Sequence, residues 1–447
     1  MPKRLLVLGA CAVMALLLVP PAPAGNGHLL HGVGAVNSSL GGSGTGQPFE
    51  VLGALHSNPA LLTQLDDFKV GISAEVFTDD LSVTTTNGAG AKHTTDSGGE
   101  PGVLPALGWS YHRPGAKTAV GFGLLAVAGF RTNFPADSAS LLLAPPPAGF
   151  GRLATDLAIT KIPLAVAWEV NPQLSLGASL NLYQGSLVIQ PLPVVTPDCF
   201  PAVPPLSAHP ERCFRPGTSG QVASYALGLQ LGLYYEINPA WSLGFSYTTE
   251  QDFYDYKWNS NHANPNITVG PNAFGAPRRV GIDIDGPPIA SLGIGWRPNP
   301  QWKVALDGRW VGYKGTEGIG GNGGINQDLQ LVSIGWQDIL IGMLGAELQV
   351  NPNLRLRGGL NFNESPIEPA LTLNSGGTPS VFEQHYTLGA SLAVHPNLDL
   401  DFGFYYTPEN EKTGPIVTGP GTQLPAPVDI TLRNSIVSGL AAFSFHF

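Results

Sequence analysis

The stretch INPAWSLGFSYTT, residues 237–249, joins a tight turn to a segment in which apolar and small side chains alternate. From Trp241 to Tyr247 every second residue is apolar or aromatic, and serine or glycine fills the positions between them. Strict alternation places the two sets on opposite faces of a β-strand. The pattern recurs, with charges on the second face, in WKVALDGRW (302–310), LRLRGGLNF (354–362) and LDLDFGFYY (398–406). Each of these strands therefore separates an apolar environment from a polar one.

The connections between such segments fall into two classes. The short class combines Asn or His with Pro, which starts a tight turn because Pro fixes φ and Asn bonds its own backbone. Its members are VNPQL (170–174), INPAW (237–241), PNPQW (298–302), VNPNL (350–354) and VHPNL (394–398), with RPGAK (113–117) as a sixth. The long class spans roughly 79–102, 131–155, 190–222, 250–277, 313–337, 364–380 and 408–431.

Short and long connections alternate along the chain, and this alternation decides the fold class. Seven long and six short connections join fourteen strands. Short turns at one end and long loops at the other are typical of outer-membrane barrels, whereas a β-sandwich has no reason to keep that asymmetry. The sequence therefore predicts an all-β protein, a 14-stranded antiparallel transmembrane β-barrel.

Aromatic residues near the short turns agree with a barrel. Trp168, Trp241, Trp296 and Trp302 lie within a few residues of these turns, where an interfacial aromatic girdle is expected. The chain ends AAFSFHF, with Phe443, Phe445 and Phe447 on one face, and this ending resembles the C-terminal strand of bacterial outer-membrane barrels.

The composition narrows the class of protein further. Charged residues make up 12% of the chain, about half the usual share of a globular protein, and glycine (57) and proline (41) are abundant. The net charge of −10 argues against nucleic acid as a partner.

The first residues predict export. Residues 1–24 read as a secretory signal peptide, with two basic residues, an apolar core from Leu5 to Val19 and small residues before the cleavage site. LGAC, ending at Cys11, is the alternative, a lipoprotein-type site. Sec-type export followed by insertion into the bacterial outer membrane is the expected localisation.

The chain after the signal peptide contains two cysteines, Cys199 and Cys213. In an oxidising compartment we expect them to form a disulfide. The histidines are scattered and no GxSxG pattern occurs, so we predict no metal site, no cofactor and no enzymatic activity.

Several stretches resemble the FadL family of outer-membrane transporters for long-chain fatty acids and hydrocarbons (OMPP1/FadL/TodX). GVGAVNSSLGGSGTG (32–46) and NPALLTQL (58–65) resemble the N-terminal hatch of that family. AVGFGLLAVAGFRTNF (119–134), followed by TDL (155–157), is similar to its third strand and the loop after it, and residues 335–369 are similar to its late strands and Ser-Pro loop.

The resemblance implies a plugged barrel that works as a monomer. Residues 25–67 would form the plug in the lumen, and residues 68–447 the barrel with its long external loops. The plug turn would take part in gating, and a kink in the third strand, at Gly129 and Phe130, would open a lateral gap. The residues of the plug turn are Asn58, Pro59, Ala60, Leu61 and Leu62. Glycines that only fit the curvature of a barrel are the alternative explanation for the third strand.

The longest loop, residues 190–217, is apolar and rich in proline, so we expect it to capture the ligand or, alternatively, to cap the barrel. The stretch LLLAPPPAGF (141–150) is a candidate to join it. The ligand-capture residues we expect are Leu192, Val194, Val195, Phe200, Val203 and Leu206.

One departure from the family concerns a ligand carboxylate. Fatty-acid transporters of the family carry a basic residue just beyond the tyrosine of the fifth strand, where this chain has Gln184 and Gly185. A carboxylate buried without a cation is costly, so this departure favours neutral hydrocarbons. The candidate substitutes are Arg131, Arg309 and Lys314.

The resulting hypothesis is passive uptake of hydrophobic small molecules, captured by external loops and released by movement of the plug, laterally at the third strand. The alternative is a non-specific water-filled porin, and an enzymatic or adhesive barrel is a third hypothesis. The expected partners are the hydrophobic ligand, outer-membrane lipid and, during biogenesis, the barrel-assembly machinery.

Overall fold

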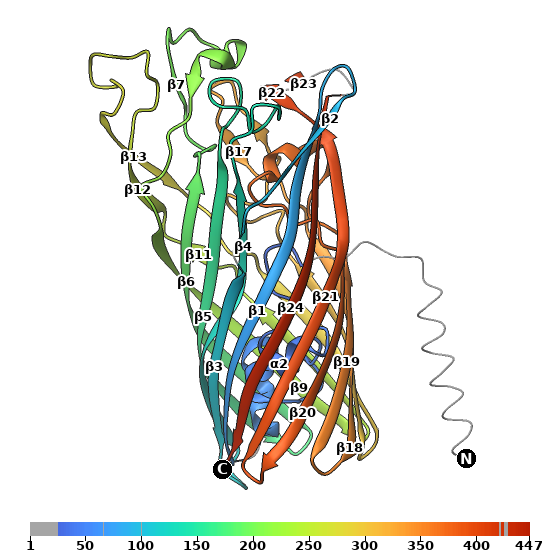
Figure 1. Ribbon diagram of the computed structural model, residues 1–447. Coiled ribbons are helices and arrows are strands. Elements are labelled where there is room, and N and C mark those ends of the chain that lie inside the picture. Colours follow the sequence, from blue (N-terminus) through green and yellow to red (C-terminus); the bar gives the residue numbers. More distant parts are fainter. Residues whose placement is uncertain (1–25, 66, 100, 420–421, 424–427) are drawn as a thin grey trace.

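The computed structural model describes residues 26–65, 67–99, 101–419, 422–423 and 428–447; the predicted signal peptide, residues 1–24, lies outside this part of the chain. Within the described residues, fourteen long strands form one closed antiparallel sheet (Figure 1). The strands are β1 (Asp67–Thr86), β3 (Gly102–His112), β4 (Thr118–Phe134), β5 (Leu153–Asn171), β6 (Leu174–Gln190), β9 (Val222–Asn238), β10 (Trp241–Thr248), β14 (Ile289–Asn299), β15 (Trp302–Val311), β18 (Ile339–Asn351), β19 (Leu354–Asn363), β20 (Gln384–His395), β21 (Leu398–Pro415) and β24 (Asp429–His446).

The barrel closes between its first and last strands. Each long strand pairs with its neighbours in the sequence, and β24 pairs with β1 from Lys69 opposite His446 to Thr86 opposite Asp429. The structure therefore confirms the predicted 14-stranded antiparallel barrel.

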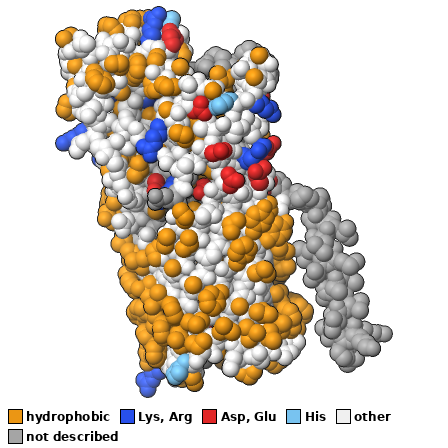
Figure 2. Space-filling model, viewed as in Figure 1, with side chains coloured by type: hydrophobic (Ala, Val, Ile, Leu, Met, Phe, Trp, Pro, Cys, Tyr) orange, Lys and Arg blue, Asp and Glu red, His pale blue; other side chains and the backbone are white. Residues whose placement is uncertain are grey.

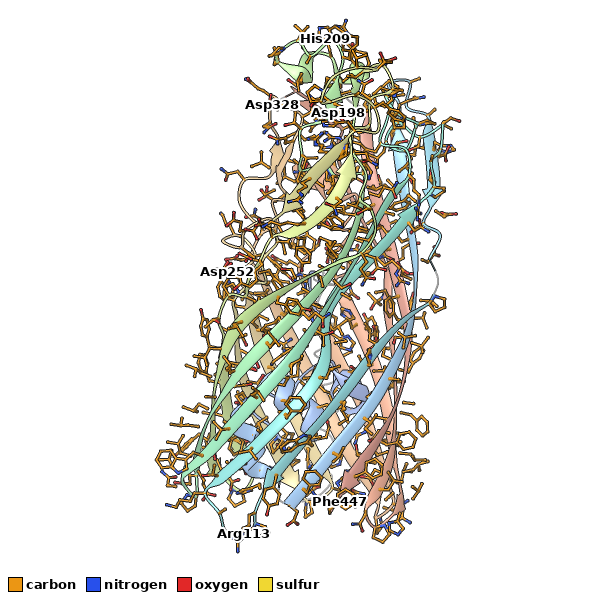
Figure 3. The ribbon with its side chains drawn as sticks, turned by 90° about the vertical axis from the view of Figure 1, so that its left-hand side faces the viewer. Arg113, Asp198, His209, Asp252, Asp328 and Phe447 are labelled. Carbon is orange, nitrogen blue, oxygen red and sulfur yellow. A yellow bond between two sulfur atoms is a disulfide. The ribbon has the colours of Figure 1, made fainter. Side chains whose placement is uncertain are left out.

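The short turns and the long loops lie at opposite ends of the barrel. Figure 3 shows Arg113 of a short turn near Phe447 at one end, and Asp198, His209 and Asp328 of the long loops at the other. The Asn-Pro chemistry sets the short turns. In one of them the Asn238 side chain accepts hydrogen bonds from the backbone N–H groups of Ala240 (2.9 Å) and Trp241 (3.1 Å).

Some strands extend further toward the long loops than the sequence analysis expects. β1 continues to Thr86 and β21 to Pro415, because hydrogen-bonded pairing persists beyond the apolar band. The remaining elements belong to the long connections between the barrel strands: β2 (Lys92–Asp96), β7 (Asp198–Cys199), β8 (Cys213–Phe214), β11 (Asp252–Phe253), β12 (Tyr256–Asn261), β13 (Pro277–Ile282), β16 (Gly324–Ile325), β17 (Leu331–Ser333), β22 (Val417–Gly419), β23 (Thr422–Gln423), η2 (Leu206–Ala208), η3 (Pro210–Arg212) and η4 (Pro369–Ser375).

The outer surface of the barrel is apolar over the half nearer the short turns. Figure 2 shows hydrophobic side chains covering this half, while acidic and basic side chains gather above it. Trp168 is 52% exposed, and the rings of Trp241 and Trp296 stack with centroids 5.6 Å apart beside a short turn. Such a band matches the hydrocarbon layer of a membrane with an aromatic girdle at its edge.

Residues 26–65 lie inside the barrel, with α2 in the half nearer the short turns (Figure 1). This segment contains α2 (Gly34–Ser38), α3 (Val51–Ser57) and η1 (Pro59–Gln64). Side chains cap the last two: Glu50 accepts from the backbone of Leu52 at the start of α3, and Asn58 accepts from Ala60 (3.0 Å) at the start of η1. Among the described residues, no helix is both long and apolar enough to cross a membrane.

The wall of the barrel is shaped to receive this inner segment. A Cβ atom on Gly244 of β10 would lie 1.9 Å from the carbonyl oxygen of Thr45, so only glycine allows the two backbones to approach this closely. Asp307 of β15 accepts hydrogen bonds from the N–H groups of Gly44 (2.8 Å) and Thr45 (2.7 Å). The polar inner face of the barrel therefore satisfies the backbone of the segment that fills it.

Candidate functional site: a series of cavities

A large apolar cavity, here called the inner pocket, lies beneath the external loops. It contains about 1040 Å³ of empty space, part of it open to solvent. Trp336 contributes its ring, and its indole N–H donates to the Ser375 hydroxyl (3.0 Å), so the polar group of that side chain is already paired. Further lining residues include Phe130, Leu142, Phe150, Val194 and Ile319.

A second cavity, the outer groove, lies between external loops and contains about 1050 Å³ of empty space. Leu141, Pro146 and Pro147 line it, which places the stretch 141–150 at the groove. The outer groove and the inner pocket share Leu142, Phe150, Arg215, Ile325 and Leu373. The two cavities are therefore adjacent.

A third cavity, the side opening, contains about 910 Å³ and lies at a gap in the barrel wall. The pairing of β3 with β4 ends at Ala106 opposite Leu125, whereas β4 continues to Phe134. Above Leu125, β5 is the one strand of the described barrel that pairs with β4. The side opening lies at this gap and shares Phe130 with the inner pocket.

A β-bulge lies at the lower edge of the gap. The register between β4 and β5 shifts between Ala126 and Ala128, which leaves Val127 as the extra residue. Directly after the bulge, a Cβ on Gly129 would lie 2.5 Å from the carbonyl oxygen of Leu157, so glycine permits this close approach. The irregularity thus begins just before Gly129 and Phe130, the two residues predicted for the kink.

The first described residues of the inner segment cover the free edge of β4. Leu29 and Ala128 form an isolated antiparallel bridge. The Leu30 N–H donates to the Val127 carbonyl (3.0 Å), and the Gly129 N–H donates to the His28 carbonyl (2.8 Å). The N-terminal residues therefore take the place that β3 leaves empty.

A fourth, more polar cavity lies in the lumen and contains about 630 Å³. Two buried cations line it: Lys161 donates to the carbonyl of Leu55 (3.1 Å) and to Gln230 (2.7 Å), and Arg309 donates to Ser291 (3.2 Å). This polar pocket shares Leu30 and Ala128 with the side opening.

The three predicted carboxylate partners lie in different places. Arg309 lines the polar pocket. Arg131 is at the rim of the side opening and pairs with Asp156 (3.0 Å). Lys314 is exposed, lines none of these four cavities, and its backbone N–H donates to Asp338 (2.8 Å).

Sequence reasoning missed Lys161. Lys161 of β5 lies directly opposite Tyr183 of β6. Because β6 is the fifth strand of the barrel, the preceding strand supplies a cation beside the tyrosine of that fifth strand. The space next to Gly185 is filled instead, since a Cβ there would lie 1.8 Å from the hydroxyl oxygen of Tyr256. The sequence did contain a signal for this site, because Lys161 occupies an inward-facing position of a strand in which inward and outward residues alternate.

The six residues expected to capture ligand do not line one common cavity. Val194 alone among them lines the inner pocket, and none of them lines the outer groove. Leu192 and Leu206 are buried, because they pack within the loops. Val195 is half-buried against the core, whereas Phe200 and Val203 are exposed.

A disulfide joins Cys199 to Cys213 and closes the long loop on itself. The adjacent Asp198 accepts from His262 (2.7 Å) and Arg278 (3.0 Å), which come from the β12–β13 region. The loop that carries Val194 is therefore fixed to a second external hairpin.

The plug turn is held by the wall. The Asn58 amide group donates to the carbonyl oxygens of Thr45 (2.8 Å) and Leu233 (3.0 Å), and Pro59, Ala60, Leu61 and Leu62 are buried.

These features define an outer-membrane β-barrel whose lumen is occluded by its own N-terminal segment. Residues 27–426 match the sequence family described as outer membrane protein transport protein (OMPP1/FadL/TodX), and the chain belongs to this family. The protein is therefore an outer-membrane transport protein. A comparison with curated protein sequences finds no match.

Solved structures with the same fold cover nearly the whole chain. The toluene transporter TodX of P. putida is 19% identical, with 94% of this chain and 99% of that chain covered and a TM-score of 0.68. The toluene transporter TbuX of Ralstonia pickettii is 18% identical, with 94% and 99% covered and a TM-score of 0.66. A FadL homologue of Pseudomonas aeruginosa is 14% identical, with 94% and 98% covered and a TM-score of 0.71.

Proposed function

We propose that the protein moves hydrophobic small molecules, such as long-chain fatty acids or hydrocarbons, passively across the outer membrane. The observation that carries this proposal is the series of three adjacent cavities: outer groove, inner pocket and side opening. Structurally similar proteins described as toluene transporters and as a monoaromatic hydrocarbon channel support a ligand of this kind.

The lining of the inner pocket explains why an apolar ligand would enter. Burial of apolar surface stabilises a bound ligand by about 25 cal/mol per Å². Polar groups that a ligand would have to desolvate are few, since Trp336 already donates to Ser375. An apolar molecule leaves water at this point and loses no hydrogen bonds.

The ligand would leave through the side opening. Phe130 lies between the inner pocket and this opening, and Val103 of β3, beside the gap, is 63% exposed on the outer surface. Release at this height delivers the ligand to the side of the barrel rather than through the lumen.

Residues 25–67 act as the plug in this proposal, and the first described residues, 26–30, are its movable part. Gly27 and Leu30 line the side opening, so their displacement would widen it. The turn from Asn58 to Leu62 instead anchors the plug, since Asn58 bonds the wall at Leu233.

The polar pocket is the proposed place for a polar head group in the lumen. Of the three candidates from the sequence, Arg309 is the one that lines it, together with Lys161. Arg131 is engaged with Asp156 at the rim, and Lys314 is exposed and does not line the polar pocket.

A water-filled porin is the second candidate from the sequence. The hydrogen bonds that Asp307 accepts from the plug backbone favour a closed lumen over an open one. An open pore would show steady ion conductance in a planar bilayer, whereas the proposed transporter should be nearly silent.

Uptake tests the proposed function directly. Cells that lack the protein should take up a panel of long-chain acids and hydrocarbons more slowly than cells that produce it. Phe130→Trp should slow uptake by narrowing the passage between two cavities. Phe274→Trp, at an exposed loop position that lines none of the three cavities, should not. Equal uptake by all strains across the panel would disprove the proposal.

A further inference from the structure

Arg215 lies where three external loops meet. Its guanidinium donates to the carbonyl oxygens of Pro193 (3.1 Å) and Leu329 (2.6 Å), and it lies over the ring of Phe150 at 5.3 Å. The same residue lines both the outer groove and the inner pocket. Arg215 therefore stands at the passage between the two cavities.

The guanidinium has no acidic partner in the part of the chain that the structure describes. Both of its hydrogen bonds go to neutral carbonyl groups. Three other arginines of the barrel and its loops differ, because each meets a carboxylate: Arg278 meets Asp198, Arg297 meets Glu236, and Arg357 meets Glu347. A desolvated cation without a counter-ion is costly, so an anion that arrives beside it is stabilised.

Arg215 is also the one charged residue among those that line the inner pocket. Burial lowers its pKa to about 10, which leaves the side chain positively charged at neutral pH. The positive charge thus faces a largely apolar chamber that has no other charged residue in its lining.

We propose that Arg215 is a specificity-determining residue that binds the carboxylate of an amphiphilic ligand while the apolar tail occupies the inner pocket. This inference rests on the proposed uptake function and narrows its substrate class to anionic amphiphiles. The ring of Phe150 already covers one face of the guanidinium. The ligand carboxylate would therefore bind the N–H groups that do not donate to the loop carbonyls.

The test compares two ligands that differ only in charge. Dodecanoate and methyl dodecanoate are bound to the full-length protein in nanodiscs near pH 8, and dissociation constants are measured for each. Arg215→Gln keeps hydrogen-bond donors for the loop carbonyls but removes the charge. It should weaken dodecanoate binding about ten- to hundredfold, because a hydrogen bond to a charged group contributes roughly one to two powers of ten. Binding of the methyl ester should be unchanged.

Two further variants complete the experiment. Arg215→Lys should restore part of the dodecanoate affinity, since the charge returns without the planar fork. Arg212→Gln is the matched control, because Arg212 is partly exposed, pairs with Glu211 and lines neither cavity.

The outcomes separate the inference from the function on which it rests. Equal loss for both ligands in Arg215→Gln would show that Arg215 only holds the loops together, and unchanged dodecanoate binding would show no role at all; either result overturns the inference. If the wild-type protein bound neither ligand, the proposed function itself would fail. Retained ester binding by Arg215→Gln shows that the variant is folded.

Discussion

Leu29 of the plug and Ala128 of β4 face each other across an antiparallel bridge at the gap in the barrel wall. The hydrogen bonds flank this pair, from Leu30 to Val127 and from Gly129 to His28, so Leu29 and Ala128 themselves form a non-hydrogen-bonded pair. Side chains of such a pair are close together. The plug therefore closes the wall by completing the sheet locally.

Cross-linking this pair tests whether the plug must move. A Leu29→Cys, Ala128→Cys double variant should form a disulfide that fixes residues 28–30 on β4. We expect ligand uptake to be lost under oxidising conditions and to return on reduction. Each single cysteine variant, treated in the same way, controls for reduction of Cys199–Cys213. Full uptake by the oxidised double variant would rule out movement of this segment as the gate.

Removing the carboxylate of Asp307 should loosen the plug. Its oxygen accepts from the backbone of Gly44 and Thr45, and each hydrogen bond to a charged group is worth about 1.5–3 kcal/mol. Asp307→Ala should raise ion conductance in planar bilayers above the low level of the wild-type protein. Asp328→Ala, at the loop end of the barrel, is the control and should stay silent. A silent Asp307→Ala variant would mean that the other anchors suffice.

A methyl group at Gly244 should destabilise the barrel with its plug. The added Cβ would meet the Thr45 carbonyl at 1.9 Å, and forced repacking typically costs about 1–3 kcal/mol. Thermal unfolding of Gly244→Ala in detergent should therefore begin at a lower temperature. Gly308→Ala serves as the matched variant, because a Cβ there has open space, and its unfolding should be unchanged.

The loop after β4 should respond to acid. The hydrogen bonds from His93 and then Thr95 lower the pKa of Asp137 from 3.8 to about 2. A carboxyl group whose pKa is lowered in the folded state stabilises that state at pH values above its ordinary pKa. This stabilisation is lost as the pH falls toward the lowered pKa. We expect the protection of residues 92–96 against hydrogen exchange, measured relative to the intrinsic exchange rate at each pH, to fall between about pH 4 and pH 2. In Asp137→Asn this protection should no longer change across the range.

The barrel could be predicted because membrane and lumen impose opposite demands on successive residues. Trp241 to Tyr247 shows this alternation, and Asn238 accounts for the adjoining turn through its own hydrogen bonds. The family resemblance predicted residues 25–67 as the plug inside the barrel, a placement that periodicity alone could not give. Periodicity and turn chemistry are local properties, which is why the architecture follows from them.

The cavities could not be predicted in the same way. Whether Val194 or Phe200 lines a pocket depends on how several external loops pack together, and no local pattern records this. The β4 bulge did leave a signal, since alternation breaks at Leu125–Ala128, where four successive residues are buried. At the gap, β3 alternates regularly up to Ala106, where its pairing with β4 ends, and the adjoining Pro105 has no backbone N–H to donate to a neighbouring strand.

Two residues separate the last helical turn of the plug from the first strand of the barrel. The last helical turn of the plug ends at Gln64, and β1 begins at Asp67. β1 is also the strand that closes the barrel by pairing with β24. Complete extraction of the plug would therefore pull on the first strand and peel open the seam that closes the cylinder. Residues 26–30 can move over a short distance without disturbing this pairing. A larger displacement of the plug would disrupt the pairing of β1 with β24 and make the outer membrane leaky at this barrel.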